Sequence, residues 1–142
     1  MSKQQDIDPS RHYVSVVLSS KSKARLLNRV RPHHQNVGGD HVTIVSHPTE
    51  DDIARYRDLH GRQVSFHATH HAVDPKSKVQ AVRVRGLDHL SDKEHKHVTI
   101  STGPSVSAVK SNELLANQKG ERLPDWVPLT GTIHFAERLG KK

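Results

Sequence analysis

The tetrapeptide His-Val-Thr-Ile occurs twice in this chain, at residues 41–44 and 97–100. Each copy lies in a stretch rich in β-branched residues, which is typical of a strand, and a turn and a helical pattern follow it. The copies are about 56 residues apart, which is roughly half of the chain that we expect to be ordered. We therefore interpret them as a weak internal repeat and expect two related halves.

Chance accounts for some matches of this kind. With 13 His and 7 Thr in 142 residues, about 0.6 His-x-Thr triplets are expected by accident, and a lone match is a weak motif. A third triplet, His67-Ala68-Thr69, continues into two further histidines and has no apolar residue after its threonine. We interpret that triplet as accidental and the two tetrapeptides as functional, the alternative being two Val-rich strands with outward polar residues.

The two tetrapeptides place chemically useful side chains on one face of each strand. Residues i and i+2 of a strand point the same way, so His41 shares a face with Thr43, and His97 shares one with Thr99. If the two halves pack against each other, two imidazoles and two hydroxyls can meet in one cleft. Imidazoles suit paired general acid and base catalysis near neutral pH, and hydroxyls can donate to phosphate oxygens. This chemistry needs no metal.

This layout resembles the 2H phosphoesterase superfamily, which is named for two His-x-Thr/Ser-x motifs on a bilobal fold. The resemblance covers most of the chain in layout and is specific at the two tetrapeptides. After the second motif, Val109-Lys110-Ser111-Asn112-Glu113-Leu114-Leu115 is similar to the corresponding segment in the cyclic phosphodiesterase domain of fungal-type tRNA ligases, with Asn one place early. We therefore expect a stand-alone version of that module.

The resemblance implies a metal-independent 2′,3′-cyclic phosphodiesterase that acts on RNA ends in RNA repair or tRNA processing. It implies His97 as the general base, His41 as the general acid, and Thr43 and Thr99 as the groups that hold the phosphate. The cyclic phosphate would be hydrolysed to a monophosphate, which in this branch is the 2′-phosphate. No cofactor is implied.

Three further residues are candidates for substrate binding. Tyr13 begins the first predicted strand and can line the cleft. Lys110 can bind phosphate through its positive charge, and Trp126 can stack on a base. The alternatives are a core tyrosine, a solvated helix lysine and a tryptophan that anchors a loop. Arg83 and Arg85 can form a basic stripe for an RNA backbone, or a solvated strand face.

Composition narrows the class of protein. The net charge of +7 favours an anionic partner such as RNA, and the absence of Cys excludes a disulfide scaffold, a Cys-ligated zinc site and a thiol nucleophile. No apolar run is long enough to span a membrane, and the N-terminus has no secretory signal. We expect a monomer in the cytoplasm, with the nucleus as an alternative. Only 32% of the residues are hydrophobic, which predicts a lean core of Val, Ile and Leu.

Other functions stay open. The cluster His67, His70 and His71 is a candidate metal site, because His67 and His71 share one face of the predicted strand. Two observations argue against a metal: Asp74 is the only carboxylate between 63 and 85, and no His-Glu-x-x-His pattern occurs. The same 2H site can instead cleave cyclic oligonucleotide signals, 2′-5′ oligoadenylates or ADP-ribose cyclic phosphate. A non-catalytic basic RNA-binding module is a third possibility, and it predicts steep salt dependence.

The patterning predicts an α+β protein, bilobal and pseudo-symmetric, with two mostly antiparallel sheets, flanking helices and a central cleft. We expect a disordered lead-in over 1–10 and a single domain over 11–142. The predicted strands cover 13–18, 41–45, 63–69, 78–85, 97–101 and 130–136. The predicted helices cover 21–31, a segment after the N-cap Thr49, and 105–117, and 33–40 and 118–128 are predicted loops.

Overall fold

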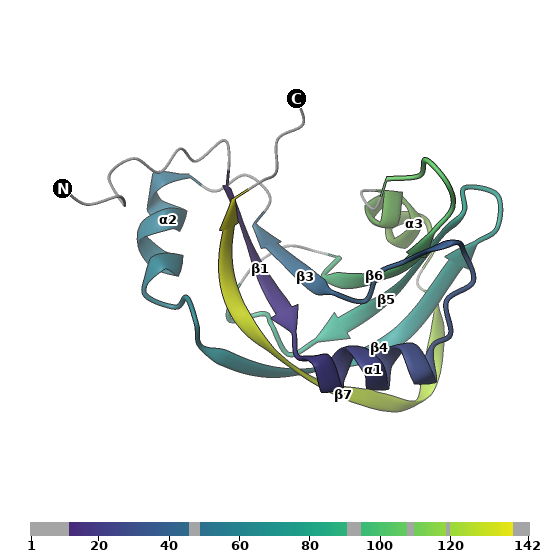
Figure 1. The fold of residues 1–142 in the computed structure, drawn as a ribbon, viewed down its shortest axis with the longest axis horizontal. Coiled ribbons are helices and arrows are strands. Elements are labelled where there is room, and N and C mark those ends of the chain that lie inside the picture. Colours follow the sequence, from purple (N-terminus) through teal and green to yellow (C-terminus); the bar gives the residue numbers. More distant parts are fainter. Residues whose placement is uncertain (1–11, 46–48, 91–94, 108–109, 119, 138–142) are drawn as a thin grey trace.

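The computed structural model describes residues 12–45, 49–90, 95–107, 110–118 and 120–137, which form seven strands and three helices (Figure 1). The predicted lead-in over 1–10 lies outside the described residues. The strands are β1 (His12–Leu18), β2 (Asn36–Val37), β3 (His41–Val45), β4 (Gln63–Asp74), β5 (Val79–Arg85), β6 (His97–Thr102) and β7 (Glu121–Glu137). The helices are α1 (Ser20–Arg29), α2 (Glu50–Arg57) and α3 (Lys110–Asn117).

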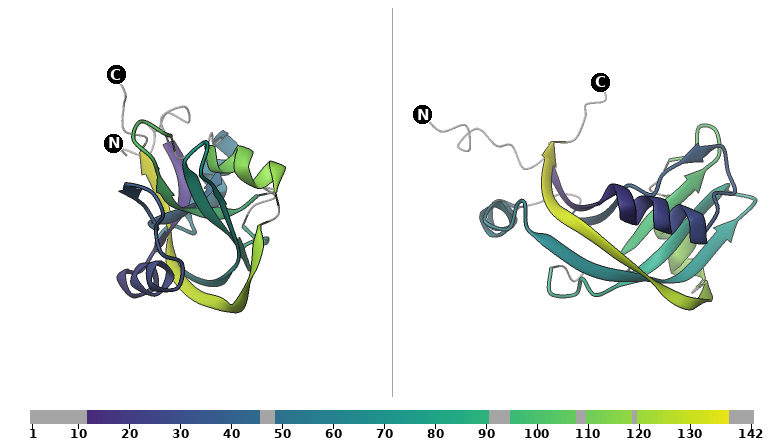
Figure 2. Two further views of the ribbon diagram at one scale, coloured as in Figure 1. Left: turned by 90° about the vertical axis from the view of Figure 1, so that its right-hand side faces the viewer. Right: turned by 60° about the horizontal axis from the view of Figure 1, so that its bottom comes forward.

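The described strands form one antiparallel sheet that closes on itself. Its order is β2-β6-β3-β1-β7-β4-β5, and β5 pairs again with β6. Six strands therefore make a closed barrel, and the short β2 lies beside the end of β6. Figure 2 shows these strands wrapping around a common centre. The prediction of an α+β fold with antiparallel strands is confirmed.

We predicted a bilobal fold with two sheets, but the described strands form a single sheet. The reason is long-range pairing that sequence patterning does not reveal: β5 pairs with β6 from Val79 opposite Thr102 to Arg83 opposite His97. On the other side, the long β7 pairs with both β1 and β4. The strands of the two halves thus share edges, and no break separates a first sheet from a second one among the described strands.

The barrel interior is filled by aliphatic side chains that alternate along the strands. Val42 and Ile44 of β3, and Val98 and Ile100 of β6, are almost fully buried there. The predicted lean core of Val, Ile and Leu is confirmed, with Phe66 and Tyr56 as its large aromatic members. A second, smaller cluster lies on the outer face under α3 and consists of Ala72, Val79, Ala81, Leu114 and Leu115.

Local capping signals set the first two helices. Ser19 caps α1, its hydroxyl accepting a hydrogen bond from the backbone N–H of Ser22 at 3.1 Å. Thr49 and Asp52 form a reciprocal capping box at the start of α2. Ser22 of α1 is buried, and its hydroxyl accepts a hydrogen bond from the Thr130 backbone N–H at 2.8 Å, which joins the helix to β7.

Several predicted boundaries need correction. The predicted loop over 118–128 belongs largely to β7. A strand can contain Pro124 because this residue lies where the pairing of β7 with β4 is interrupted, and Pro128 lies near that interruption. The strand predicted over 63–69 continues to Asp74 as β4. The helix predicted over 105–117 begins only at Lys110, and the loop over 33–40 contains β2.

Candidate active site

The two His-Val-Thr-Ile tetrapeptides lie side by side on neighbouring strands. Val42 of β3 stands opposite Val98 of β6 in the antiparallel ladder, and both side chains are 0% exposed in the core. His41 and Thr43 flank Val42 on β3, and His97 and Thr99 flank Val98 on β6. Because the two valines point inward, these four polar residues belong to the outer face of the barrel. The structure thus brings together all four predicted catalytic residues, hereafter the four-residue site.

The paired valines set the arrangement of the four-residue site, because its members are the immediate chain neighbours of Val42 and Val98. The side chain of His41 is exposed and the other three are half-buried, so the site faces solvent.

The orientation of the His97 ring is fixed by the backbone. Its Nδ1 lies 2.6 Å from the carbonyl oxygen of His95. A carbonyl can only accept, so Nδ1 carries the proton and donates. In the neutral ring Nε2 is then the nitrogen without a proton, which is the tautomer that a general base acting through Nε2 requires.

The environment of His41 favours its neutral form. Although part of the side chain reaches solvent, partial desolvation by its neighbours lowers the pKa of His41 below the usual value, and the adjacent Asp40 carboxylate opposes this shift without reversing it. Asp40 is itself exposed and forms an ion pair with Lys23 at 2.7 Å. The protonation of His41 is therefore set by its packing first and by Asp40 second.

Thr99 is held from two sides. Its hydroxyl lies 2.8 Å from the hydroxyl of Ser111, a fully buried residue in the first turn of α3. The backbone N–H of Gly39 donates to the Thr99 carbonyl at 2.8 Å. A Cβ on Gly38 would lie only 2.6 Å from the same carbonyl, so a side chain there is excluded by the close approach of the two backbones.

Polar residues continue across the sheet from the four-residue site. Arg83 of β5 stands opposite His97, and His70 of β4 stands opposite Arg83. The Arg83 guanidinium donates to the Leu115 carbonyl at 2.6 Å and to the Gln118 carbonyl at 3.2 Å, near the end of α3. It also donates to Nδ1 of His95 at 3.0 Å. Arg83 thus connects the strand of His97 with α3.

The three predicted substrate-binding residues lie at different distances from the four-residue site. Lys110 begins α3 beside Ser111, is exposed, and forms an ion pair with Glu113 at 3.8 Å. Tyr13 lies in β1 opposite Ala136, and its side chain lies outside the described set. Trp126 is in β7, beyond β5 and β4, so the structure does not bring it against the tetrapeptides.

Sequence reasoning missed the supporting roles of Ser111 and His95. In the sequence, Ser111 is only one member of the segment 109–115 that follows the second tetrapeptide. Nothing in that segment indicates that the Ser111 hydroxyl contacts Thr99. His95 reads as an ordinary connector histidine, but its carbonyl orients His97. The alternation of β5 does indicate that Arg83 points outward, whereas its place opposite His97 depends on a pairing that only the fold reveals.

The histidines of β4 do not share a face as predicted. The register shifts between Ala68 and His70, so that His67 and His70 both lie opposite outward-facing arginines while His71 lies opposite the buried Val82. His71 instead contacts Gln80 through its Nε2 at 2.9 Å. Within the described residues, no group of three or more His, Cys, Asp or Glu is arranged to hold a metal ion.

No known protein-family model and no curated protein matches this chain. Among the helices that the described residues form, none has the length and apolar character needed to cross a membrane. What the four-residue site does must therefore be inferred from its own residues and geometry.

Proposed function

We propose that this protein is a metal-independent phosphodiesterase of the 2H type that hydrolyses 2′,3′-cyclic phosphates at RNA ends. One observation carries the proposal: Val42 and Val98 are paired and buried, which aligns His41, Thr43, His97 and Thr99 on one accessible face. A binding module without catalysis would have no need of two identical His-x-Thr pairs opposed in this way.

The geometry supports a single in-line hydrolysis. His97 takes a proton from water through Nε2 as the water oxygen attacks phosphorus. The bond between phosphorus and the ribose O3′ breaks, and His41 in its protonated form donates its proton to O3′. The Asp40 carboxylate favours this protonated form, against the desolvation that disfavours it. Thr43 and Thr99 donate hydrogen bonds to the non-bridging oxygens, where negative charge increases in the transition state. The product of this route is a 2′-phosphate.

The fold is compatible with the pseudo-symmetric arrangement of the 2H superfamily. Each motif strand leads toward a helix, since α2 follows β3 and α3 follows β6 in the chain. We infer that the closed barrel is a compact form of the two-lobed layout, with the motif strands at the junction of the two halves. The net charge of +7 is suited to an RNA partner.

The test is hydrolysis of a 2′,3′-cyclic nucleoside monophosphate in excess EDTA. We expect activity in the wild-type protein and a loss of at least about 100-fold in His41→Ala and in His97→Ala, since each removes a general acid or base. His89→Ala, at an exposed connector position, is the matched control and should keep full activity. Circular dichroism and thermal melting check that each variant is folded.

Two outcomes would overturn the proposal. Full activity in the double variant His41→Ala/His97→Ala would show that the four-residue site is not catalytic. Absence of activity on a panel of 2′,3′-cyclic mononucleotides and RNA ends would refute the substrate class. If kcat/KM is higher for cyclic oligonucleotides, 2′-5′ oligoadenylates or ADP-ribose cyclic phosphate than for 2′,3′-cyclic phosphates, the catalytic site stands and the assigned substrate changes.

A further inference from the structure

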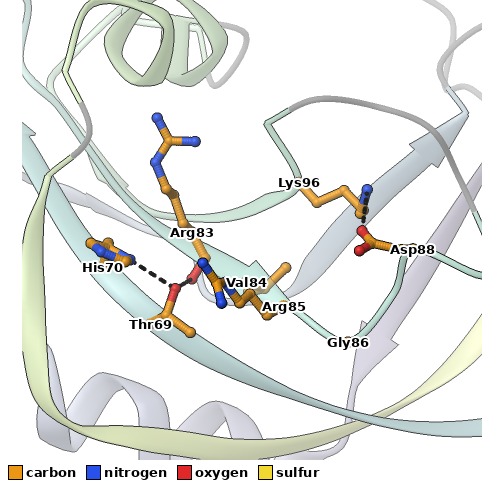
Figure 3. A pocket seen from close by; sticks show the side chains of 8 residues that line it. All are labelled: Thr69, His70, Arg83, Val84, Arg85, Gly86, Asp88 and Lys96. Carbon is orange, nitrogen blue, oxygen red and sulfur yellow. Dashed lines mark hydrogen bonds and ion pairs between the residues drawn. The ribbon is translucent and has the colours of Figure 1, made fainter.

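A pocket of about 590 Å³ opens beside the four-residue site. Figure 3 shows its lining, which comes from β4, β5 and the connector that precedes β6. The lining residues are Thr69, His70, Arg83, Val84, Arg85, Gly86, Asp88 and Lys96. Arg83, which stands opposite His97, links this pocket to the catalytic strand.

The pocket is cationic. Arg83, Arg85 and Lys96 contribute three positive charges, against a single carboxylate from Asp88. Asp88 is 93% exposed and lies 3.1 Å from the Lys96 ammonium at the pocket rim. The backbone bulge of β4 adds Thr69 and His70, whose Oγ1 and Nδ1 atoms lie 3.0 Å apart. Cations and hydrogen-bonding groups of this kind bind phosphate oxygens.

An aromatic platform borders the pocket. The Arg85 guanidinium carbon lies 5.5 Å from the centre of the Trp126 ring, and the His67 ring lies 6.0 Å from it. Trp126 is 38% exposed, which is unusual for a residue of its size. An exposed indole beside an arginine is a surface on which a nucleobase can stack.

We propose that this pocket binds an internal phosphate of single-stranded RNA and that Trp126 stacks on a neighbouring base. The inference rests on the proposed function, because it takes the 3′ end to lie in the four-residue site. The preferred substrate is then an RNA oligonucleotide with a 2′,3′-cyclic phosphate end, bound through groups beyond its terminal nucleotide. A free cyclic mononucleotide reaches only the four-residue site.

The strand order supports this path. Adjacent strands are about 4.8 Å apart, so β5 lies one strand spacing and β4 about two strand spacings from His97. An extended RNA strand that leaves the four-residue site crosses these strands within about one or two nucleotides and then reaches Trp126 on β7. Along this path the arginines of β5 come first, and Trp126 of β7 comes last.

The test compares two substrates and several variants of the full chain. We expect kcat/KM for a five-nucleotide RNA with a 2′,3′-cyclic end to exceed that for the cyclic mononucleotide by about 10-fold or more. Arg85→Gln and Trp126→Leu should each remove most of this advantage and leave the mononucleotide rate unchanged. Arg57→Gln, an exposed arginine on α2, is the matched control and should change neither rate. Arg83 is not varied because it also holds α3.

Binding gives a second readout that does not depend on catalysis. We expect His41→Ala/His97→Ala to bind the five-nucleotide RNA, and Arg85→Gln in that background to weaken binding and to reduce the salt slope of log K by about 1. Equal kcat/KM for both substrates, or no effect of Arg85→Gln on RNA binding, would overturn the pocket assignment while cyclic mononucleotide hydrolysis continues. If the wild-type protein hydrolyses neither the five-nucleotide RNA end nor the cyclic mononucleotide, the proposed function itself is overturned.

Discussion

The hydroxyl of Ser111 lies 2.8 Å from the hydroxyl of Thr99, which joins the first turn of α3 to the second His-Val-Thr-Ile strand. Ser111 is fully buried, so water does not compete for this contact. When Ser111 donates to Thr99, the proton of Thr99 is available to a phosphate oxygen. The helix thereby orients a hydroxyl that we propose to act in catalysis.

We predict that Ser111→Ala lowers kcat on a cyclic nucleotide on the order of 10-fold with little change in KM, because an unheld Thr99 hydroxyl stabilises the transition state less. The free energy of unfolding should decrease by about 1 kcal/mol, which is typical of one lost hydrogen bond. Ser65→Ala, at an exposed position of β4, is the control and should leave kcat unchanged. Unchanged kcat in Ser111→Ala would contradict the positioning role.

A second prediction concerns two glycines. In Gly38→Ala the new Cβ would lie 2.6 Å from the Thr99 carbonyl, so the strand that carries Thr99 must shift. Gly61 has φ +91°, and a Cβ added there would meet no atom within 4 Å, so Gly61→Ala only strains the backbone. We expect both variants to lose about 1–3 kcal/mol in urea unfolding, but only Gly38→Ala to lose most of its hydrolytic activity. Equal activity in the two variants would contradict a role of this close approach.

Local signals in the sequence predicted much of this fold. The N-cap Thr49 indicated the start of α2, because capping depends on residues only three positions apart. The β-branched run of each tetrapeptide indicated β3 and β6. Alternation within each tetrapeptide also predicted that histidine and threonine share a face, and the buried valines agree with this.

Non-local pairing is what the sequence did not reveal. The closure of β5 onto β6 places Arg83 opposite His97, although these residues lie on strands separated by a long connector. The bulge near Thr69 changes which histidines of β4 face outward, and no alternation rule anticipates an inserted residue. The pocket beside the four-residue site follows from both effects, so neither its place nor its lining was predictable from the pattern alone.

A third prediction tests which histidine is the acid. The Asp40 carboxylate raises the pKa of His41, so Asp40→Asn should lower that pKa further. If protonated His41 is the acid, activity requires the charged form, and the alkaline limb of the kcat/KM profile moves to lower pH. Asp125→Asn, at an exposed carboxylate, is the control. A shift of the acidic limb alone would reverse the assignment and make His41 the base.

The final prediction concerns stability and His71. The Gln80 side-chain oxygen accepts from the His33 backbone N–H at 2.9 Å, which turns the amide nitrogen of Gln80 toward Nε2 of His71, also at 2.9 Å. The amide nitrogen can only donate, so this Nε2 must accept and the ring must be neutral. Burial, and then the nearby His33, lower the pKa of His71, while Glu121 opposes the shift.

The sign of the pH dependence follows from this shift. A histidine whose pKa is lower in the folded state binds more protons when the chain is unfolded, so stability falls as pH decreases through 6.5 and below. We expect the urea midpoint to decrease between about pH 7.5 and pH 5, and His71→Gln to reduce that slope. His89→Gln, at an exposed connector position, should keep the wild-type slope. An unchanged slope in His71→Gln, or an NMR titration of His71 at or above its ordinary value, would refute this coupling.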